Sequence, residues 1–337
     1  MSRLTFVGVA VLYLSGCDVD PSARRSISPE RSIVIFSATE TWQSAEEHLR
    51  AVFEAPVETP QLERAFALRR ESLEEFDFFS QYGMVLFLVS LDRADEVRKF
   101  LDGFVSQETW AAAQRGDGWL VTHRDLWARP QMVGILAAGS RPELLGRIQV
   151  NGDALFRVYD GFVQDVLAEP LLRRTQDDLK ERILASTGID LPVPRHYLVR
   201  YEDPARDAVA IWKRRAREDL QLFAQLTSGA SESGLRERCL DWRRKVVTPV
   251  YGGDEVRSEG LVSESAVFGD RTGVRLRGLW QNQRYIMGGP FETWCIPDPR
   301  SNRTLMLDLA VFSPDRPKMA GLRELQALAS RVTVPDN

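Results

Sequence analysis

The stretch YGMVLFLVSL, from Tyr82 to Leu91, is apolar along both sides of an extended chain. Because side chains of a strand alternate between its faces, one face would carry Val85, Phe87 and Val89 and the other Met84, Leu86 and Leu88. A strand that is apolar on both faces is covered on both faces by other parts of the protein. This stretch therefore predicts a central, fully covered strand.

Strand and helix patterns alternate on both sides of this stretch. A buried-strand run begins at Ile33, and the segment after it carries apolar residues at helical spacing from Trp42 to Phe53. Further helices are predicted over 93–105 and 108–114, and further strands over 62–68, 119–122 and 132–137. A last helical pattern begins near Leu155 and is broken or kinked by Pro170. The alternation predicts an N-terminal α/β domain over residues 33–185 that closes with a long helical connector.

The pattern changes after residue 185, where Pro192 and Pro194 exclude a helix. Three strands, a helix, three strands and a closing helix follow, over 197–201, 208–214, 220–226, 235–247, 265–280, 285–296, 305–312 and 319–332. This order predicts a C-terminal α+β domain over residues 186–337, with a helix-covered sheet similar in pattern to the PsbP-like fold. The whole chain is predicted to be an α+β protein with two helix-covered, largely antiparallel sheet domains.

The N-terminal segment has the pattern of a bacterial lipoprotein signal peptide. Arg3 precedes an uncharged apolar run that ends in the box Leu14–Cys17 (LSGC), and the run is too short to span a bilayer. We expect residues 1–16 to be cleaved and Cys17 to carry the lipid that holds the protein on its membrane. A transmembrane anchor, or a chance occurrence of the box, is the alternative. Residues 17–32 are rich in Pro, Ser and Arg, which predicts a lipidated flexible tether.

Composition and charge limit the partners. Hydrophobic residues make up 44% of the chain, charged residues 27%, and the net charge is -4, which argues against a general nucleic-acid-binding protein. The basic runs Lys213–Arg215 and Arg243–Lys245 are interpreted as solvated faces. The predicted location is the cell envelope, outside the cytoplasm. Asp18 resembles an inner-membrane retention signal whose use varies between lineages, so the choice between inner and outer membrane stays open.

Two cysteines remain once Cys17 is lipidated. Cys239 falls in a predicted helix and Cys295 in a predicted strand, and outside the cytoplasm a disulfide between them is chemically allowed. They would meet if that helix covers that sheet. The alternative is that both thiols are simply buried.

The run Met287-Gly288-Gly289-Pro290-Phe291 interrupts a predicted strand. Adjacent glycines in a strand mark a bulge or a close backbone approach, and proline cannot donate a ladder hydrogen bond. One interpretation is a sheet corner that requires glycine for its geometry. The other is a ligand-contacting turn beside Trp280.

This run, preceded by Gly278-Leu279-Trp280, resembles the bacterial lipoprotein family of domain of unknown function 4837. The resemblance extends over most of the mature chain, and it also includes Trp42, the segment 189–194, Trp212 and 312–314. It implies an envelope lipoprotein without an established activity, and it assigns no catalytic residues.

The sequence contains no recognisable catalytic, metal or cofactor motif. His48, His123 and His196 fall on different predicted elements, without partners at metal-ligand spacing. The segment Gly229–Ser233 lacks the second glycine of a serine-hydrolase elbow. The prediction is therefore no catalytic residue, no metal ligand and no cofactor, although a triad dispersed in sequence stays open.

We expect a non-catalytic envelope protein with a binding or structural role, whose partner is a protein, a glycan or a lipid-linked molecule. The alternative is an envelope hydrolase that acts on cell-wall or glycan material through a dispersed site. A polar pocket that gathers His123 or His196 with acids or a serine would favour the hydrolase. An exposed aromatic patch would favour the binding protein.

Overall fold

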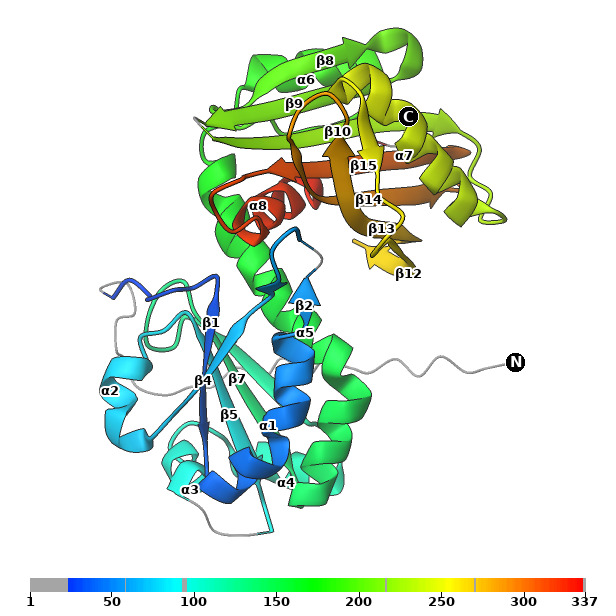
Figure 1. Cartoon of the computed structure of the whole chain (residues 1–337). Helices are drawn as coiled ribbons and strands as arrows, with labels where there is room; N and C mark the ends of the chain where they lie inside the picture. The colour runs from blue at the N-terminus through cyan, green and yellow to red at the C-terminus, as the bar shows by residue number, and fades with distance from the viewer. Residues whose placement is uncertain (1–23, 58, 93–95, 216, 270, 336–337) are drawn as a thin grey trace. The chain divides into compact units, whose positions relative to one another are not determined.

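The computed structural model describes residues 24–57, 59–92, 96–215, 217–269 and 271–335 (Figure 1). The predicted signal peptide and the predicted lipid-attachment residue Cys17 lie outside these residues. The chain forms two compact units. Among the described residues, unit 1 contains those up to Ala55 and from Arg64 to Val166, and unit 2 contains those from Pro56 to Glu63 and from Leu167 onward. The units therefore divide ahead of the predicted boundary at 185/186, and unit 2 takes in a short segment from the first part of the sequence.

The sheet of unit 1 has five strands in the order β4-β1-β5-β7-β6. Their bounds are β1 Ser32–Ser37, β4 Ala67–Glu71, β5 Met84–Ser90, β6 Leu120–Arg124 and β7 Met132–Ala138. The pairs β1–β4, β1–β5 and β5–β7 are parallel, and only β6 runs antiparallel to its neighbour β7. The α+β class is confirmed, but the expectation of a largely antiparallel sheet is wrong for this unit. Helical crossovers between its strands impose parallel pairing.

Every residue of β5 is buried, which confirms the central strand expected from the sequence. One face of the sheet packs against α2 (Phe76–Phe79), α3 (Glu96–Leu101) and α4 (Gln107–Arg115). The other face lies against α1 (Thr39–Phe53) and α5 (Arg141–Leu172), which Figure 1 shows beside the strands. The remaining short elements before β5 are β2 (Pro56–Val57), β3 (Glu63–Arg64) and the 3-10 turn Leu73–Glu75.

The long helix α5 continues through Pro170 and ends two residues later, at Leu172. Its kink lies instead at Asn151, whose φ of -112° and ψ of 15° are not helical. The Asn151 side chain donates to the carbonyl of Arg147, over 3.0 Å, and so competes with the helical bonds of that turn. The connector continues in α6, Asp177–Thr187.

Residues 24–31, which the sequence assigned to a flexible tether, are hydrogen-bonded to other parts of unit 1. The Ile27 N–H donates to the Gln81 carbonyl, and the Gly83 N–H donates to the Ile27 carbonyl, both over 2.9 Å. The Ser26 N–H donates to the Arg129 carbonyl over 3.1 Å. Main-chain bonds of this kind depend little on side-chain composition. The prediction of flexibility is therefore wrong for this part of the segment.

Unit 2 contains an eight-stranded sheet in the order β11-β13-β14-β15-β10-β9-β8, with β12 paired to β13. Its strands are β8 Leu198–Asp203, β9 Ala208–Arg215, β10 Glu218–Ser228, β11 Asp254–Val256, β12 Val262–Phe268, β13 Arg271–Asn282, β14 Gly288–Asp298 and β15 Arg303–Phe312. All the pairs are antiparallel, as predicted for the C-terminal domain.

Helices cover both faces of the second sheet. The helix α7, Leu235–Tyr251, packs on one face and continues past residue 247, where the sequence predicted its end. The other face packs against α6 and α8, Met319–Ala329. A 3-10 turn, Pro204–Arg206, links β8 to β9. None of the described helices is long and apolar enough to span a bilayer.

The helix α8 receives its N-terminal cap from a distant part of the sequence. Lys318 occupies the N-cap position and provides no side-chain cap. The Glu63 carboxylate instead accepts from the N–H groups of Lys318 and Met319, over 2.8 and 3.0 Å. A carboxylate at this position also interacts favourably with the helix dipole.

Candidate functional site

The Met287–Phe291 motif begins β14 rather than breaking it. Gly288, Gly289 and Pro290 lie opposite Gln281, Trp280 and Leu279 of β13. Pairing with β15 on the other side begins only at Phe291. Pro290 therefore lies where no ladder bond to β15 is needed, as expected for a proline in a sheet. The prediction of an interrupted strand is wrong, because the glycines continue the β13 ladder.

Close backbone approach explains both glycines. A Cβ atom on Gly289 would lie 1.9 Å from the carbonyl oxygen of Val311, and one on Gly288 would lie 2.8 Å from that of Trp280. Neither glycine has a positive φ. The motif therefore lets β14 lie closer to its neighbours than a side chain would allow, which favours the architectural interpretation.

Immediately before the motif, the tip of the β13–β14 hairpin exposes two large apolar side chains. We call residues Gln283–Met287 the hairpin tip. Tyr285 is 64% exposed and Ile286 is 106% exposed. Met287 turns back and packs against the sheet cluster that contains Trp280. The exposed aromatic residue therefore lies next to the motif, not within it.

The hairpin tip is held by a well-bonded turn. The Asn282 side-chain oxygen accepts from the N–H groups of Arg284 and Tyr285, over 2.9 and 3.0 Å. The Asn282 N–H donates to the Met287 carbonyl over 2.9 Å. An asparagine that bonds its own following backbone in this way fixes the turn. Tyr285 and Ile286 are thus presented on an ordered loop.

Polar bonds connect the tip to the neighbouring strand β11. The Asn282 amide donates to Asp254 and the Gln283 amide donates to Glu255, each over 2.6 Å. Burial raises the pKa of the Asp254 carboxyl, and the Asn282 bond acts in the opposite direction. The surroundings of the tip are therefore acidic and hydrogen-bonded.

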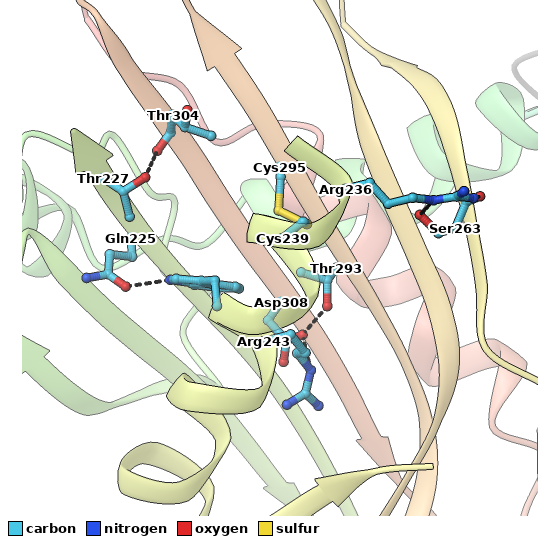
Figure 2. The surroundings of a disulfide bond; sticks show 11 residues. Gln225, Thr227, Arg236, Cys239, Arg243, Ser263, Thr293, Cys295, Thr304 and Asp308 are labelled. Atoms are coloured by element: carbon cyan, nitrogen blue, oxygen red, sulfur yellow. Dashed lines mark hydrogen bonds and ion pairs between the residues drawn. A yellow bond between two sulfur atoms is a disulfide. The ribbon is translucent and has the colours of Figure 1, made fainter. Parts of the chain in front are cut away.

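Beneath α7 lies a buried ion pair that the sequence pattern did not reveal. Nε of Arg243 lies 2.6 Å from Oδ1 of Asp308, and both side chains are fully buried. Thr293 donates to the same oxygen over 2.6 Å, as Figure 2 shows. The Arg243 guanidinium lies 4.6 Å from the ring centre of Phe291, the last residue of the motif. Burial raises the pKa of Asp308, while the Arg243 charge acts in the opposite direction.

The interpretation of both basic runs as solvated faces is wrong for one member of each. Arg243 is fully buried, and Lys213 is only 4% exposed. Lys213 donates to Glu324 of α8, which also accepts from the Tyr197 hydroxyl over 2.8 Å. For Arg243, though not for Lys213, the spacing of residues in the sequence indicates burial. Arg243 follows Cys239 by four residues, so both lie on the covered face of α7.

A disulfide joins Cys239 of α7 to Cys295 of β14 (Figure 2). The two Cα atoms are 5.9 Å apart, within the usual range for a disulfide. The sequence left open whether these cysteines form a disulfide or are two buried thiols, and in the structure they form the disulfide. The bond lies one helical turn from Arg243, so a covalent link and an ion pair both tie α7 to the sheet.

The histidines are not gathered into a polar pocket. His48 contacts Gln149, His196 is exposed, and burial lowers the pKa of His123. A cavity of about 950 Å³ in unit 1 is lined mainly by α4, β6 and α5, and none of its lining residues is a histidine. Within the described ranges no group of His, Cys, Asp and Glu side chains is arranged to hold a metal ion.

Comparison with known families agrees with the division into units. Residues 176–330 match the model of the domain of unknown function DUF4837, which confirms the resemblance seen in Met287–Phe291. Residues 26–162 match a different one, the domain of unknown function DUF8532. Trp42 therefore belongs to the DUF8532 match. No curated protein matches the chain.

Several solved structures show distant similarity. LpqN of Mycobacterium tuberculosis, described as involved in cell envelope biogenesis, is 16% identical, covers 44% of this chain and 83% of its own, and has a TM-score of 0.29. The Saccharomyces cerevisiae Ran-binding protein Mog1p is 10% identical, with coverages of 44% and 90% and a TM-score of 0.29. A Bacteroides thetaiotaomicron protein is 8% identical, with coverages of 45% and 47% and a TM-score of 0.27.

Proposed function

We propose that this protein is a lipid-anchored, non-catalytic protein of the bacterial envelope that binds another protein through the hairpin tip. The observation that carries the proposal is the combination of exposure and order at Tyr285 and Ile286. Both side chains are exposed, yet the turn that holds them is fixed by Asn282.

The exposed pair does not serve the stability of the fold. Ile286 is as exposed as in an extended chain, so its side chain contributes no buried area to folding. An ordered loop loses little conformational freedom when a partner binds, which favours affinity. Tyr and Arg are enriched among the residues that dominate protein–protein binding, and Arg284 precedes Tyr285 in the tip.

The charges around the tip favour a protein partner over a lipid surface. Glu255 is exposed and accepts from Gln283 of the tip, and Asp254 lies beside it on β11. Amphipathic segments that bind bilayers combine apolar residues with basic ones, because many lipid headgroups are anionic. Arg284 is the single basic residue of the tip, and the Glu255 carboxylate beside the tip offsets its charge.

The anchor part of the proposal rests on the Leu14–Cys17 box of the sequence. Cys17→Ala is expected to abolish lipid attachment and to release the protein from the membrane fraction. Intact mass of the purified parent checks for the lipid, and cell fractionation checks for the release. A parent chain without lipid, or a variant that stays on the membrane, would refute the anchor.

The tip is tested by a photoreactive phenylalanine analogue placed at position 286 in the full chain and irradiated in the producing cells. The expected result is a discrete cross-linked species whose second component is one envelope protein, identified by mass spectrometry. The matched control is the same analogue at Leu198, an apolar residue of β8 that is 69% exposed. Equal cross-linking at both positions, or cross-links to lipid alone, would contradict a protein-binding tip.

A double variant separates binding from folding. Tyr285→Ala with Ile286→Ala is expected to keep the parental unfolding midpoint, since both side chains are exposed, and to lose the cross-linked partner from a reporter at Gln283. A fall in stability that matches the loss of cross-linking would show that the two residues serve the fold.

A further inference from the structure

We propose that unit 1 binds a small molecule through its phosphate group at the carboxyl end of the sheet, beside the N-terminus of α1. The proposal concerns the DUF8532 part of the chain and is independent of the hairpin tip. It rests on the arrangement of two helices, an unpartnered serine and two arginines.

The helices α1 and α5 lie side by side and point in the same direction. Near their N-termini Arg141 donates to Glu40 over 2.7 Å, and further along His48 of α1 contacts Gln149 of α5. At the other end of α1, the rings of Phe53 and Tyr159 are 5.4 Å apart. The positive ends of both helix dipoles therefore meet at the carboxyl end of β1 and β7.

The two helix ends differ in how their N–H groups are satisfied. In α5 the Gly139 N–H donates to Glu143 over 3.0 Å, so the helix supplies its own anionic group. In α1 the N-cap residue is Ala38, which has no side-chain acceptor, and the acidic residue of the first turn, Glu40, is bonded to Arg141. Uncapped N–H groups at a helix N-terminus are a general binding site for phosphate.

Ser37 places an unpartnered hydroxyl at this end. Its residue is 3% exposed, and its Oγ has no hydrogen-bond partner among the described residues. Val34 and Phe36 belong to the face that packs on α2, α3 and α4, so Ser37 points to the opposite face, toward α1 and α5. It is the last residue of β1, and α1 begins two residues later. Buried hydroxyl groups in native proteins nearly always have a partner, which points to a ligand here.

Two arginines add positive charge at the same place. Arg70 donates to the Thr39 hydroxyl over 2.9 Å, so its guanidinium lies at the first residue of α1. Arg141 pairs with Glu40 through Nη2, while its Nε is shielded from solvent and has no partner in the described part of the chain. An anion at the α1 N-terminus would give partners to Nε of Arg141 and to Oγ of Ser37.

The topology puts these groups where open α/β sheets bind ligands. From β1 the chain passes through α1 to β4 on one side, whereas β5 and β7 lie on the other side of β1. The direction in which successive strands are added to the sheet thus reverses at β1. In open α/β sheets, ligands usually bind at such a point, in the crevice outside the carboxyl ends of the strands. Ser37 and the first turn of α1 lie at this point.

Inorganic phosphate is the probe, added to the full mature chain in place of chloride at equal ionic strength. The expected result is a rise in the unfolding midpoint of unit 1 that saturates with phosphate concentration, because a ligand stabilises the state that binds it. Ser37→Ala is expected to weaken phosphate binding about tenfold, since a hydrogen bond to a charged group is lost. Removal of an unpartnered hydroxyl should leave the variant folded and as stable as the parent without phosphate.

Two further variants make the result decisive. Arg141→Gln is expected to weaken phosphate binding as well, whereas Ser106→Ala is not. Ser106 is a matched control, because its hydroxyl already caps α4 by accepting from the Thr109 N–H over 3.1 Å. Absence of a phosphate effect on the parent, or an equal effect on the parent and Ser37→Ala, would overturn the proposal.

Discussion

Arg243 and Asp308 form an ion pair with a separation of 2.6 Å between Nε and Oδ1, in which neither side chain reaches solvent. The pair connects the middle of α7 to β15, one of the inner strands of the second sheet. Two charges removed from water are tolerated only when each neutralises the other and further polar groups assist. Thr293 and the ring of Phe291 provide that assistance, so the family motif and the ion pair form one structural unit.

Breaking the ion pair from one side should be costly. Asp308→Asn leaves the Arg243 charge buried without a counter-charge, and we expect a loss of about 3–5 kcal/mol in the free energy of unfolding. Replacing both partners, as Arg243→Met with Asp308→Leu, should recover much of that loss. Urea unfolding of the parent, of Asp308→Asn and of the double variant gives the three free energies of unfolding to compare.

The exposed pair Arg173–Glu169 provides the control for this prediction, with both side chains more than half exposed. Glu169→Gln should change stability by less than about 1 kcal/mol. If Asp308→Asn costs no more than Glu169→Gln, the buried pair does not have the structural role assigned to it.

Reduction of the disulfide should destabilise unit 2. Cys239 and Cys295 are separated by 56 residues, and closing a loop of this length is worth about 4 kcal/mol through the entropy of the unfolded chain. The unfolding midpoint should therefore fall when a reductant is added. Cys239→Ala should have a low midpoint that the reductant no longer changes. An unchanged parent midpoint would show that the bond contributes little.

Gly289 should not accept even a methyl group. Because its Cβ would lie 1.9 Å from the Val311 carbonyl oxygen, Gly289→Ala must displace backbone, and we expect a cost of about 1–3 kcal/mol. A methyl group on Gly146 of α5 would meet nothing within 4 Å, so Gly146→Ala should instead stabilise by about 1 kcal/mol. Thermal unfolding of both variants tests the contrast. Similar midpoints for the two variants would contradict the close approach.

Asp254 should make the protein less stable as the pH rises. Burial raises its pKa in the folded protein above the value of about 3.9 expected in the unfolded chain. The folded state therefore binds this proton more tightly, and the resulting stabilisation is present below about pH 4 and lost as the pH rises through the folded pKa. Asp254→Asn keeps an acceptor for Asn282 and should gain stability relative to the parent over that range. Parallel pH profiles for the two chains would refute the assignment.

Much of the secondary structure is predictable from sequence because the apolar patterns are strong. The central strand β5 and its two covered faces follow directly from alternation in Tyr82–Leu91. The parallel pairing of unit 1 was not predicted. Alternation shows which side of a strand is buried and gives no direction for its neighbours, which depends on the crossovers that connect them.

The candidate site was only partly accessible to the same reasoning. Composition identified Met287–Phe291 but not the exposed pair before it, since exposure depends on how the turn is bonded. The basic run at Arg243 looked solvated, and only its four-residue spacing from Cys239 indicated a covered position. Ser26 and Ile27 are held in unit 1 by main-chain hydrogen bonds, which cannot be predicted from the types of their side chains.

The cap that Glu63 provides to α8 has a consequence for biosynthesis. Glu63 is synthesised early. Lys318 and Met319, whose N–H groups donate to its carboxylate, are synthesised more than two hundred residues later. Domains generally fold as units while the chain is being synthesised. Unit 2 therefore cannot complete its fold until α8 has been synthesised. Until then its first segment, Pro56–Glu63, lies between two segments of unit 1 in the chain without the helix that Glu63 caps. A fragment limited to residues 176–330 would contain the whole DUF4837 match but would lack Glu63, which caps α8.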